Sequence, residues 1–127
     1  MKILIIGGTG TISSAITRQL AESEHELWLL NRGNRQQEVP ANVKQIVANI
    51  DDEADVLRQI GDTMFDAVCE FIGFVTEQVE RDHRLFAGRT RQYVYISSAS
   101  AYAKPVRSYI INEGTTLCNP HWSSLSD

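Results

Sequence analysis

Short apolar runs alternate with amphipathic stretches along the chain, and this alternation predicts strands separated by helices. Five runs have the length and composition of strands, at residues 3–6, 26–30, 43–48, 66–71 and 92–96. The first run is continuously apolar, as expected for a strand that is covered on both faces. Helical spacing follows at 13–22, near 54–60 and at 76–87, whereas the polar segment 31–42 predicts a loop with at most a short helix.

The alternation indicates an α/β fold, with helices on both faces of a doubly wound parallel sheet. Right-handed crossovers give the strand order 3-2-1-4-5, with a ligand crevice where the order reverses, above strands 1 and 4. The helical spacing predicts inward-facing residues on the first and third helices: Ile12, Ala15, Ile16 and Leu20, and then Val79, His83 and Phe86. Beyond residue 103 the sequence becomes irregular, so the sheet is expected to be incomplete at its C-terminal end.

Length, charge and cysteine content narrow the class of protein. The 127 residues fit one domain, so 1–127 is predicted to be a single unit. The formal net charge of −4 disfavours a general nucleic-acid binder. Cys69 and Cys118 lack the spacing of a disulfide framework or a zinc site, and no other metal site is indicated, so a cytoplasmic location is expected. The apolar start is too short for a signal peptide or a membrane span.

The turn after the first strand has the composition of a phosphate-binding loop. Residues 7–13 read Gly-Gly-Thr-Gly-Thr-Ile-Ser and lead into an amphipathic helix. Gly7 permits the tight exit from the strand, and Gly10 has no side chain to keep a pyrophosphate from the backbone N–H groups of the helix N-terminus. Ser13 replaces the usual Gly or Ala at the third position of the fingerprint. The predicted phosphate-binding residues are Gly7, Thr9, Gly10, Thr11 and Ile12.

An empty structural turn is the alternative, because many glycine-rich turns bind nothing. The position of this turn, between a buried strand and a helix at the start of a βαβ unit, favours a Rossmann-type dinucleotide site. A nucleoside triphosphatase loop is disfavoured because no Gly-Lys-Ser/Thr follows.

Three segments carry a family resemblance. They are 7–12, then 66–73 (Asp-Ala-Val-Cys-Glu-Phe-Ile-Gly), then 95–102 (Tyr-Ile-Ser-Ser-Ala-Ser-Ala-Tyr). In order and spacing they resemble the extended short-chain dehydrogenase/reductase family, the NAD-dependent epimerases and dehydratases. The last segment, a strand ending in Ser-Ser and followed by Tyr, is the most specific of the three. Residues 30–33 (Leu-Asn-Arg-Gly) resemble its reductase-like branch.

The resemblance implies roles for individual residues. Ser98, four residues before Tyr102, occupies the place of the catalytic Ser/Thr, whose hydroxyl hydrogen-bonds the substrate oxygen that undergoes redox. The alternative for Ser98 is that it satisfies backbone groups at a strand end, and Tyr102 is expected to be a packing or loop residue. Five further residues would line the cofactor: Phe71, Ile72 and Gly73 beside the fourth strand, and Asn49 and Ile50 near the adenine.

The end of the second strand bears on the choice of dinucleotide. NAD-preferring members carry Asp or Glu there to bind the ribose 2′-hydroxyl, and here the residue is the uncharged Asn31. Arg32 and Arg35 follow and are suited to a 2′-phosphate. NADP(H) is therefore predicted over NAD(H), the alternative being that both arginines are solvated loop charges.

The family chemistry also needs a Tyr-x-x-x-Lys pair after the fifth strand. In the register of the family, Ser124 stands at the tyrosine position and the lysine would come after Asp127. The sequence therefore predicts a fragment that lacks the substrate domain and does not turn over substrate by the family mechanism. A non-catalytic module that senses the dinucleotide or regulates a partner is the alternative, and whether the chain is an enzyme stays open here.

The same resemblance predicts a homodimer or a higher assembly. In the family, two helices beside the fifth strand form the dimer interface, and one of them is missing here. Apolar surface near Val79, Phe86 and residues 93–96 is therefore expected to lack its usual cover and to recruit a partner.

Overall fold

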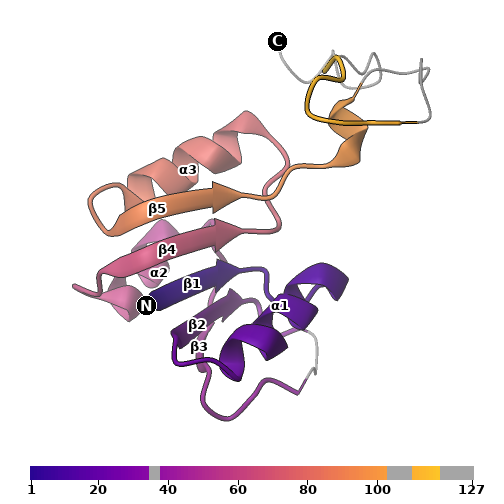
Figure 1. The fold of residues 1–127 in the computed structure, drawn as a ribbon. Helices are drawn as coiled ribbons and strands as arrows, with labels where there is room; N and C mark the ends of the chain where they lie inside the picture. Colours follow the sequence, from indigo (N-terminus) through magenta and orange to yellow (C-terminus); the bar gives the residue numbers. More distant parts are fainter. Residues whose placement is uncertain (35–37, 103–109, 118–127) are drawn as a thin grey trace. The chain divides into compact units, whose positions relative to one another are not determined.

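The computed structural model describes residues 1–34, 38–102 and 110–117. The chain divides into two compact units, Met1–Ile96 and Ser97–Asp127 (Figure 1). The first unit contains the whole sheet, so the fold that positions the candidate site belongs to it.

Five parallel strands form the sheet of the first unit. They are β1 (Lys2–Ile6), β2 (Glu26–Asn31), β3 (Lys44–Val47), β4 (Phe65–Glu70) and β5 (Thr90–Tyr95). Their order is β3-β2-β1-β4-β5, which confirms the predicted topology. Within β1, Ile5 pairs with Leu29 on one side and with Cys69 on the other. The order reverses between β1 and β4, where a parallel sheet opens a crevice at the carboxyl ends of its strands.

Three helices cover the two faces of this sheet: α1 (Thr11–Ala21), α2 (Glu53–Ile60) and α3 (Thr76–Phe86). Figure 1 shows α1 on one side of the sheet, and α2 and α3 on the other. The side chains of β1 alternate between the two cores, with Ile3 and Ile5 toward α1 and Leu4 and Ile6 toward α2 and α3. In the described ranges no helix has both the length and the apolar character needed to cross a membrane.

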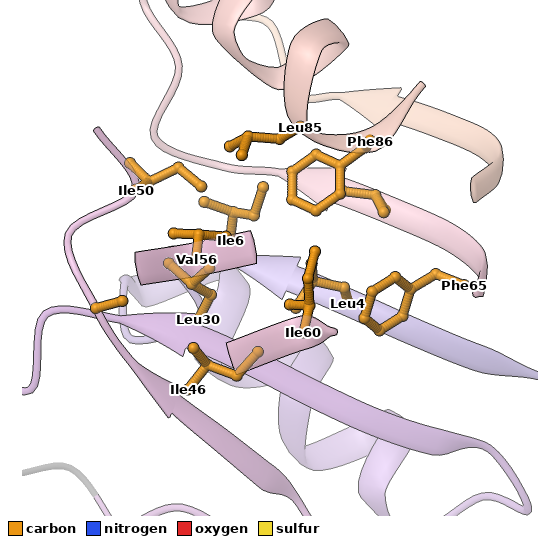
Figure 2. Packing of buried hydrophobic residues seen from close by; sticks show 12 residues of the cluster. Leu4, Ile6, Leu30, Ile46, Ile50, Val56, Ile60, Phe65, Leu85 and Phe86 are labelled. Atoms are coloured by element: carbon orange, nitrogen blue, oxygen red, sulfur yellow. The ribbon is translucent and has the colours of Figure 1, made fainter. Parts of the chain in front are cut away.

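The larger core lies between the sheet and the helices α2 and α3. Figure 2 shows Phe65 and Phe86 on one side of it, and Ile6, Val56 and Ile46 on the other. All five side chains are buried. This core packs against β1 and β4 on one face of the sheet, so the loops at the carboxyl ends of these two strands start from a rigid base.

The buried face of α1 differs from the predicted one. Ile16 and Leu20 pack against the core as expected, but Ile12 is 66% exposed, and two hydroxyl residues, Ser13 and Thr17, are buried instead. The predicted Ala15 is also exposed. Small hydroxyl side chains let the first turns of α1 lie close to the sheet beside the glycine turn, which apolar spacing alone does not reveal.

The buried face of α3 is also displaced from the prediction. Phe86 is buried as expected, but Val79 and His83 are exposed. Arg81 and Asp82 take the buried positions, and each has ionic partners that offset the cost of desolvating it. Since Phe86 belongs to the core, the expected uncovered apolar surface does not include it, although Tyr95 and Ile96 are partly exposed.

The described part of the second unit contains a short 3-10 helix, η1 (Ala99–Ala101). An isolated antiparallel bridge joins Tyr102 to Leu117 in the same unit. Tyr102 therefore takes part in a loop-to-loop pairing, as expected for a packing residue.

Replacing Phe65 by Ala should lower the free energy of unfolding by about 3–5 kcal/mol, because the ring is 1% exposed and lies edge-on to Trp28 at 5.6 Å between ring centres. The matched control is Phe74→Ala, whose ring is 57% exposed and which should change the unfolding free energy by less than about 1 kcal/mol. Urea denaturation of the two variants checks the comparison. Equal losses would contradict the core described here.

Candidate functional site

The turns that follow β1 and β4 leave the sheet side by side. Backbone hydrogen bonds continue the strand pairing one residue past β1 and β4. The Gly7 N–H donates to the Leu30 oxygen at 2.9 Å, and the Phe71 N–H donates to the Ile6 oxygen at 3.1 Å. The same edge carries the turn after β2, where the Ala48 N–H donates to the Asn31 oxygen at 2.9 Å. The residues predicted around these turns therefore share one edge of the first unit.

Gly7 is the point at which two of these turns touch. Its φ of +80° lies in the left-handed region that favours glycine. A Cβ atom built on Gly7 would lie 2.2 Å from Cγ2 of Ile72, so the Ile72 side chain rests on the bare α-carbon. The β1–α1 turn and the loop after β4 are thus in direct contact.

Ser13 closes the glycine turn with its hydroxyl group. The Ser13 Oγ donates to the Gly7 carbonyl oxygen at 2.8 Å and accepts from the Gly10 N–H at 3.0 Å. The side chain is 2% exposed. Sequence reasoning treated this serine as a small residue tolerated in place of Gly or Ala. The signal that could have shown its role is a hydroxyl residue three positions after the helix cap, which is where capping side chains bond back to the cap N–H.

The N-terminus of α1 opens at the same place. The first N–H groups of a helix have no partner within it and carry a partial positive charge. Thr11 and Ile12 in this first turn are exposed, and the turn contains no acidic residue. By contrast, α2 has Glu53 and Asp55 in its first turn. The α1 terminus therefore presents donors and positive potential without a resident carboxylate.

A cavity of about 430 Å³ lies beside the glycine turn on the α1 side. Its lining residues are Gly8, Thr9, Ser14, Thr17, Arg18, Glu38, Val39 and Pro40. Only Thr9 belongs to the predicted site. The Thr17 hydroxyl is buried, and within the described residues it has no hydrogen-bond partner. Arg18 and Glu38 give the cavity one charge of each sign. Its far wall comes from the connection between β2 and β3, so no local pattern could have revealed it.

Asn31 at the end of β2 shapes the turn that carries the predicted cations. Its Oδ1 accepts from the Gly33 N–H at 2.8 Å, and Gly33 has a φ of +73°. This Asx-type bond occupies the acceptor of the amide and leaves its NH₂ group as a donor. Arg32 between them is exposed. Arg35 lies outside the described residues.

The two residues predicted near the adenine differ in exposure. Asn49 is exposed, and its Oδ1 accepts from the Asp51 N–H at 3.0 Å. Ile50 is 2% exposed and belongs to the larger core. Its side chain is therefore a packing element, and only its backbone is left to face a ligand.

A buried carboxylate, which sequence reasoning missed, holds the loop after β4. Glu70 is 0% exposed, and its Oε1 accepts from the Ile72 N–H at 2.6 Å and from the Gly73 N–H at 2.9 Å. Phe71 between them is half-buried against the smaller core. The predicted cofactor-lining residues Phe71, Ile72 and Gly73 thus lie together, and Glu70 fixes two of their amides.

Arg81 connects this carboxylate to a wider ionic cluster. Its Nη2 donates to Glu70 Oε2 at 3.0 Å and to Asp82 Oδ1 at 2.8 Å, and its Nη1 donates to Asp51 Oδ1 at 2.8 Å. The Tyr93 hydroxyl donates to Asp82 Oδ2 at 2.6 Å. Three carboxylates therefore share one guanidinium group under the order reversal of the sheet.

Burial dominates the electrostatics of the cluster. It raises the pKa of Glu70 to about 7, and the neighbouring Asp82 carboxylate acts in the same direction, whereas the bonds from Ile72 and Arg81 oppose the shift. Burial and the Asp82 carboxylate likewise raise the pKa of Tyr93. The hydroxyl of Tyr93 therefore stays protonated and remains a donor to Asp82.

The predicted catalytic position lies in the second unit. The Ser98 hydroxyl is exposed and accepts from the Ser100 N–H at 3.1 Å, while its carbonyl oxygen accepts from the Ala101 N–H at 3.0 Å. Ser98 thus satisfies backbone groups after β5, which was the alternative considered for it. Ser124 and the rest of 118–127 lie outside the described residues.

The sequence matches the family model described as the NAD dependent epimerase/dehydratase family over residues 3–123. No curated protein matches the sequence significantly.

Solved structures share the fold at low sequence identity. The UDP-Glc/GlcNAc 4-epimerase of Campylobacter jejuni aligns with a TM-score of 0.79 and 20% identity over 93% of this chain and 43% of its own. The UDP-glucose 4-epimerase of Bifidobacterium longum, in complex with NAD+ and UDP, gives 0.75 and 19% over 99% and 46%. The Bordetella bronchiseptica enzyme WbmG, in complex with NAD, gives 0.75 and 14% over 94% and 44%. The chain spans less than half the length of each of them.

The buried carboxylate should leave a signature in the pH dependence of stability. The native state holds the Glu70 proton up to about pH 7, whereas the unfolded chain releases it near its ordinary value of 4.5. The native state then binds more protons in this window, so this stabilising contribution is present below pH 4.5 and is lost as the pH rises to about 7. The unfolding free energy of the unmodified chain minus that of Glu70→Gln should therefore fall across the window, by roughly 2–3 kcal/mol.

Glu53→Gln is the control with the opposite sign. The bonded Arg84 guanidinium lowers the pKa of Glu53, so its contribution is present at neutral pH and is lost on acidification. The corresponding difference should rise with pH. Urea denaturation at a series of pH values measures both differences, and a flat or rising curve for Glu70→Gln would contradict the buried cluster.

Proposed function

Because the chain belongs to the NAD-dependent epimerase/dehydratase family, we propose that its first unit binds a nicotinamide dinucleotide, with the pyrophosphate at the N-terminus of α1. The observation that carries this proposal is the shape of the glycine turn. Gly7 and Gly10 bring bare backbone to the helix terminus, and Ser13 ties both of them in place. A rigid turn of this kind offers its N–H groups without further ordering cost, which favours anion binding.

The residues at this edge fit the chemical parts of a dinucleotide. The exposed first turn of α1, at Thr11 and Ile12, has no acidic residue that would repel phosphate. Ile72 is 46% exposed and forms an apolar wall next to the turn, and Gly73 follows it. Asn49, two residues after the end of β3, is exposed, and its side-chain amide would face the adenine.

The end of β2 supports NADP(H) over NAD(H). An NAD-preferring site needs a carboxylate there to accept from the ribose 2′-hydroxyl. In this chain the uncharged Asn31 accepts from the Gly33 N–H with its Oδ1, and its NH₂ group would donate to a 2′-phosphate. Arg32 is exposed beside it and supplies a positive charge. We propose Arg32 as the main determinant among the described residues, with Arg35 as a second cation.

The bound nicotinamide ring would supply hydride transfer. The role that this chain offers to a substrate is a hydrogen bond from Ser98. The oxygen of that hydroxyl accepts from the Ser100 N–H, and its O–H group would donate to a substrate oxygen. The chain spans less than half the length of the enzymes that it resembles in fold, so the proposed function is confined to binding the dinucleotide and to the hydrogen bond from Ser98.

Substituting Thr11 by Glu should weaken dinucleotide binding without unfolding the protein. A carboxylate in the first helical turn interacts favourably with the helix dipole, so stability should stay unchanged or rise by about 0.3–1 kcal/mol. The same carboxylate would repel the pyrophosphate, and the dissociation constant should rise at least tenfold, by about 1.4 kcal/mol or more. Thr11→Gln, similar in size and neutral, is the matched control.

Isothermal titration calorimetry with NADPH and NADH measures the affinities, and thermal unfolding reports the stability. Equal affinity of Thr11→Glu and Thr11→Gln would place the pyrophosphate elsewhere. No heat with either dinucleotide for the unmodified chain would refute the proposed function.

Arg32→Ala should weaken NADPH binding by about tenfold and leave NADH binding within about twofold, because only NADPH carries the 2′-phosphate that the guanidinium would pair with. Arg91→Ala removes the same charge from an exposed position at the start of β5 and should change neither affinity. Tighter binding of NADH than of NADPH by the unmodified chain would overturn the NADP(H) assignment.

A further inference from the structure

The loop segment formed by Ile72 and Gly73 is held from two directions. From below, the Oε1 atom of Glu70 accepts both of its N–H groups, at 2.6 and 2.9 Å. From the β5 side, the Tyr95 hydroxyl donates to the Gly73 carbonyl oxygen at 2.8 Å. A Cβ atom on Gly73 would lie 2.7 Å from Tyr95 Cε2 and 3.0 Å from Glu70 Cγ, so there is no slack around this residue.

This segment touches the phosphate turn directly. Ile72 rests against the bare α-carbon of Gly7, where a methyl group would approach its Cγ2 to 2.2 Å. Gly7 is in turn bonded through its carbonyl oxygen to Ser13, which also holds the Gly10 N–H. A displacement of Ile72 would therefore reach the residues that set the spacing of the phosphate-binding N–H groups.

We propose that Glu70 is a positioning residue of the dinucleotide site: its carboxylate holds the Ile72–Gly73 segment against the Gly7 turn, and dinucleotide affinity depends on that contact. The inference rests on the proposed function for the affinity, but the positioning itself can be tested without any ligand.

The surroundings of Glu70 explain why a costly buried carboxylate is present at this position. A backbone segment that offers two N–H groups to a buried site needs an acceptor there, and a single carboxylate oxygen satisfies both. The charged and titratable groups that face it are Arg81 and Asp82 from α3 and Tyr93 and Tyr95 from β5, with Asp51 reached through Arg81. Arg81 fixes the other oxygen, Oε2, at 3.0 Å, which sets the direction in which Oε1 points.

The two halves of the cluster can be separated by mutation. Glu70→Gln keeps a carbonyl acceptor for the Ile72 and Gly73 N–H groups. Glu70→Met is similar in length but has no oxygen for them, while Arg81 retains its bonds to Asp82 and Asp51. Tyr93→Phe removes the 2.6 Å bond to Asp82 in the same cluster and leaves the loop amides untouched.

The test measures the dissociation constant for NADPH by calorimetry, together with amide hydrogen exchange at Ile72 and Gly73 by NMR. Glu70→Met should weaken binding at least tenfold and speed the exchange of both amides, because they lose their acceptor. Glu70→Gln should bind within about threefold of the unmodified chain. Tyr93→Phe should also bind within about threefold, although it lowers the unfolding temperature.

Unchanged affinity and unchanged exchange in a folded Glu70→Met would overturn the inference. So would a loss of affinity in Tyr93→Phe as large as in Glu70→Met, because the effect would then be general destabilisation. If Glu70→Met does not fold, Glu70→Asp takes its place. This variant withdraws the acceptor by one methylene group and keeps the charge for Arg81, and it should likewise weaken NADPH binding and speed the exchange of both amides. If the unmodified chain binds neither dinucleotide, the proposed function fails, and amide exchange alone then decides whether Glu70 positions the segment.

Discussion

The arrangement of the whole site depends on one steric constraint, the absence of a side chain at Gly7. At the order reversal of the sheet, the turns after β1 and β4 leave the same edge from neighbouring strands, so their backbones must pass close together. The Ile72 side chain fills the space where a Cβ atom of residue 7 would lie, and the positive φ lets the chain turn toward α1 at that point. A side chain at position 7 would displace the Ile72 side chain and would strain a backbone that lies in the left-handed region.

A second feature follows from the close approach of α1 to the sheet. Its buried face near the turn carries the hydroxyl groups of Ser13 and Thr17 rather than aliphatic side chains. Ser13 converts this proximity into two hydrogen bonds on the glycine turn, which gives the loop a fixed shape before any ligand arrives. Preorganised donors favour binding because little conformational entropy remains to be lost. The departure from the usual Gly or Ala at this position is therefore a structural device of the turn.

The ionic cluster of Glu70, Arg81, Asp82 and Asp51 positions the loop after β4 rather than stabilising the fold. Burying charge is costly, and the single guanidinium of Arg81 cannot neutralise the three carboxylates around it. Burial accordingly moves the pKa of Glu70 to about 7. The cluster instead fixes directions, because both oxygens of Glu70 and both oxygens of Asp82 have defined partners. The Glu70 oxygens connect Arg81 of α3 to the amides of Ile72 and Gly73.

The sequence alone determined the strands, their order and the location of the glycine turn. These follow from local periodicity, from the handedness of βαβ crossovers and from a contiguous glycine pattern, all of which act over short stretches of chain.

Three features were decided only by the tertiary structure. The faces that α1 and α3 bury, the cavity walled by residues 38–40, and the hold of Glu70 on Ile72 and Gly73 each involve partners that come together only when separate elements pack. Apolar spacing predicted Val79 and His83 on the buried face of α3, yet Arg81 and Asp82 occupy that face. The carboxylates of Glu70 on β4 and of Asp51 before α2 pair with Arg81 and offset the cost of burying it. A periodic pattern reports the average preference of a side chain for water, whereas the position of a buried ion pair depends on where its partner arrives.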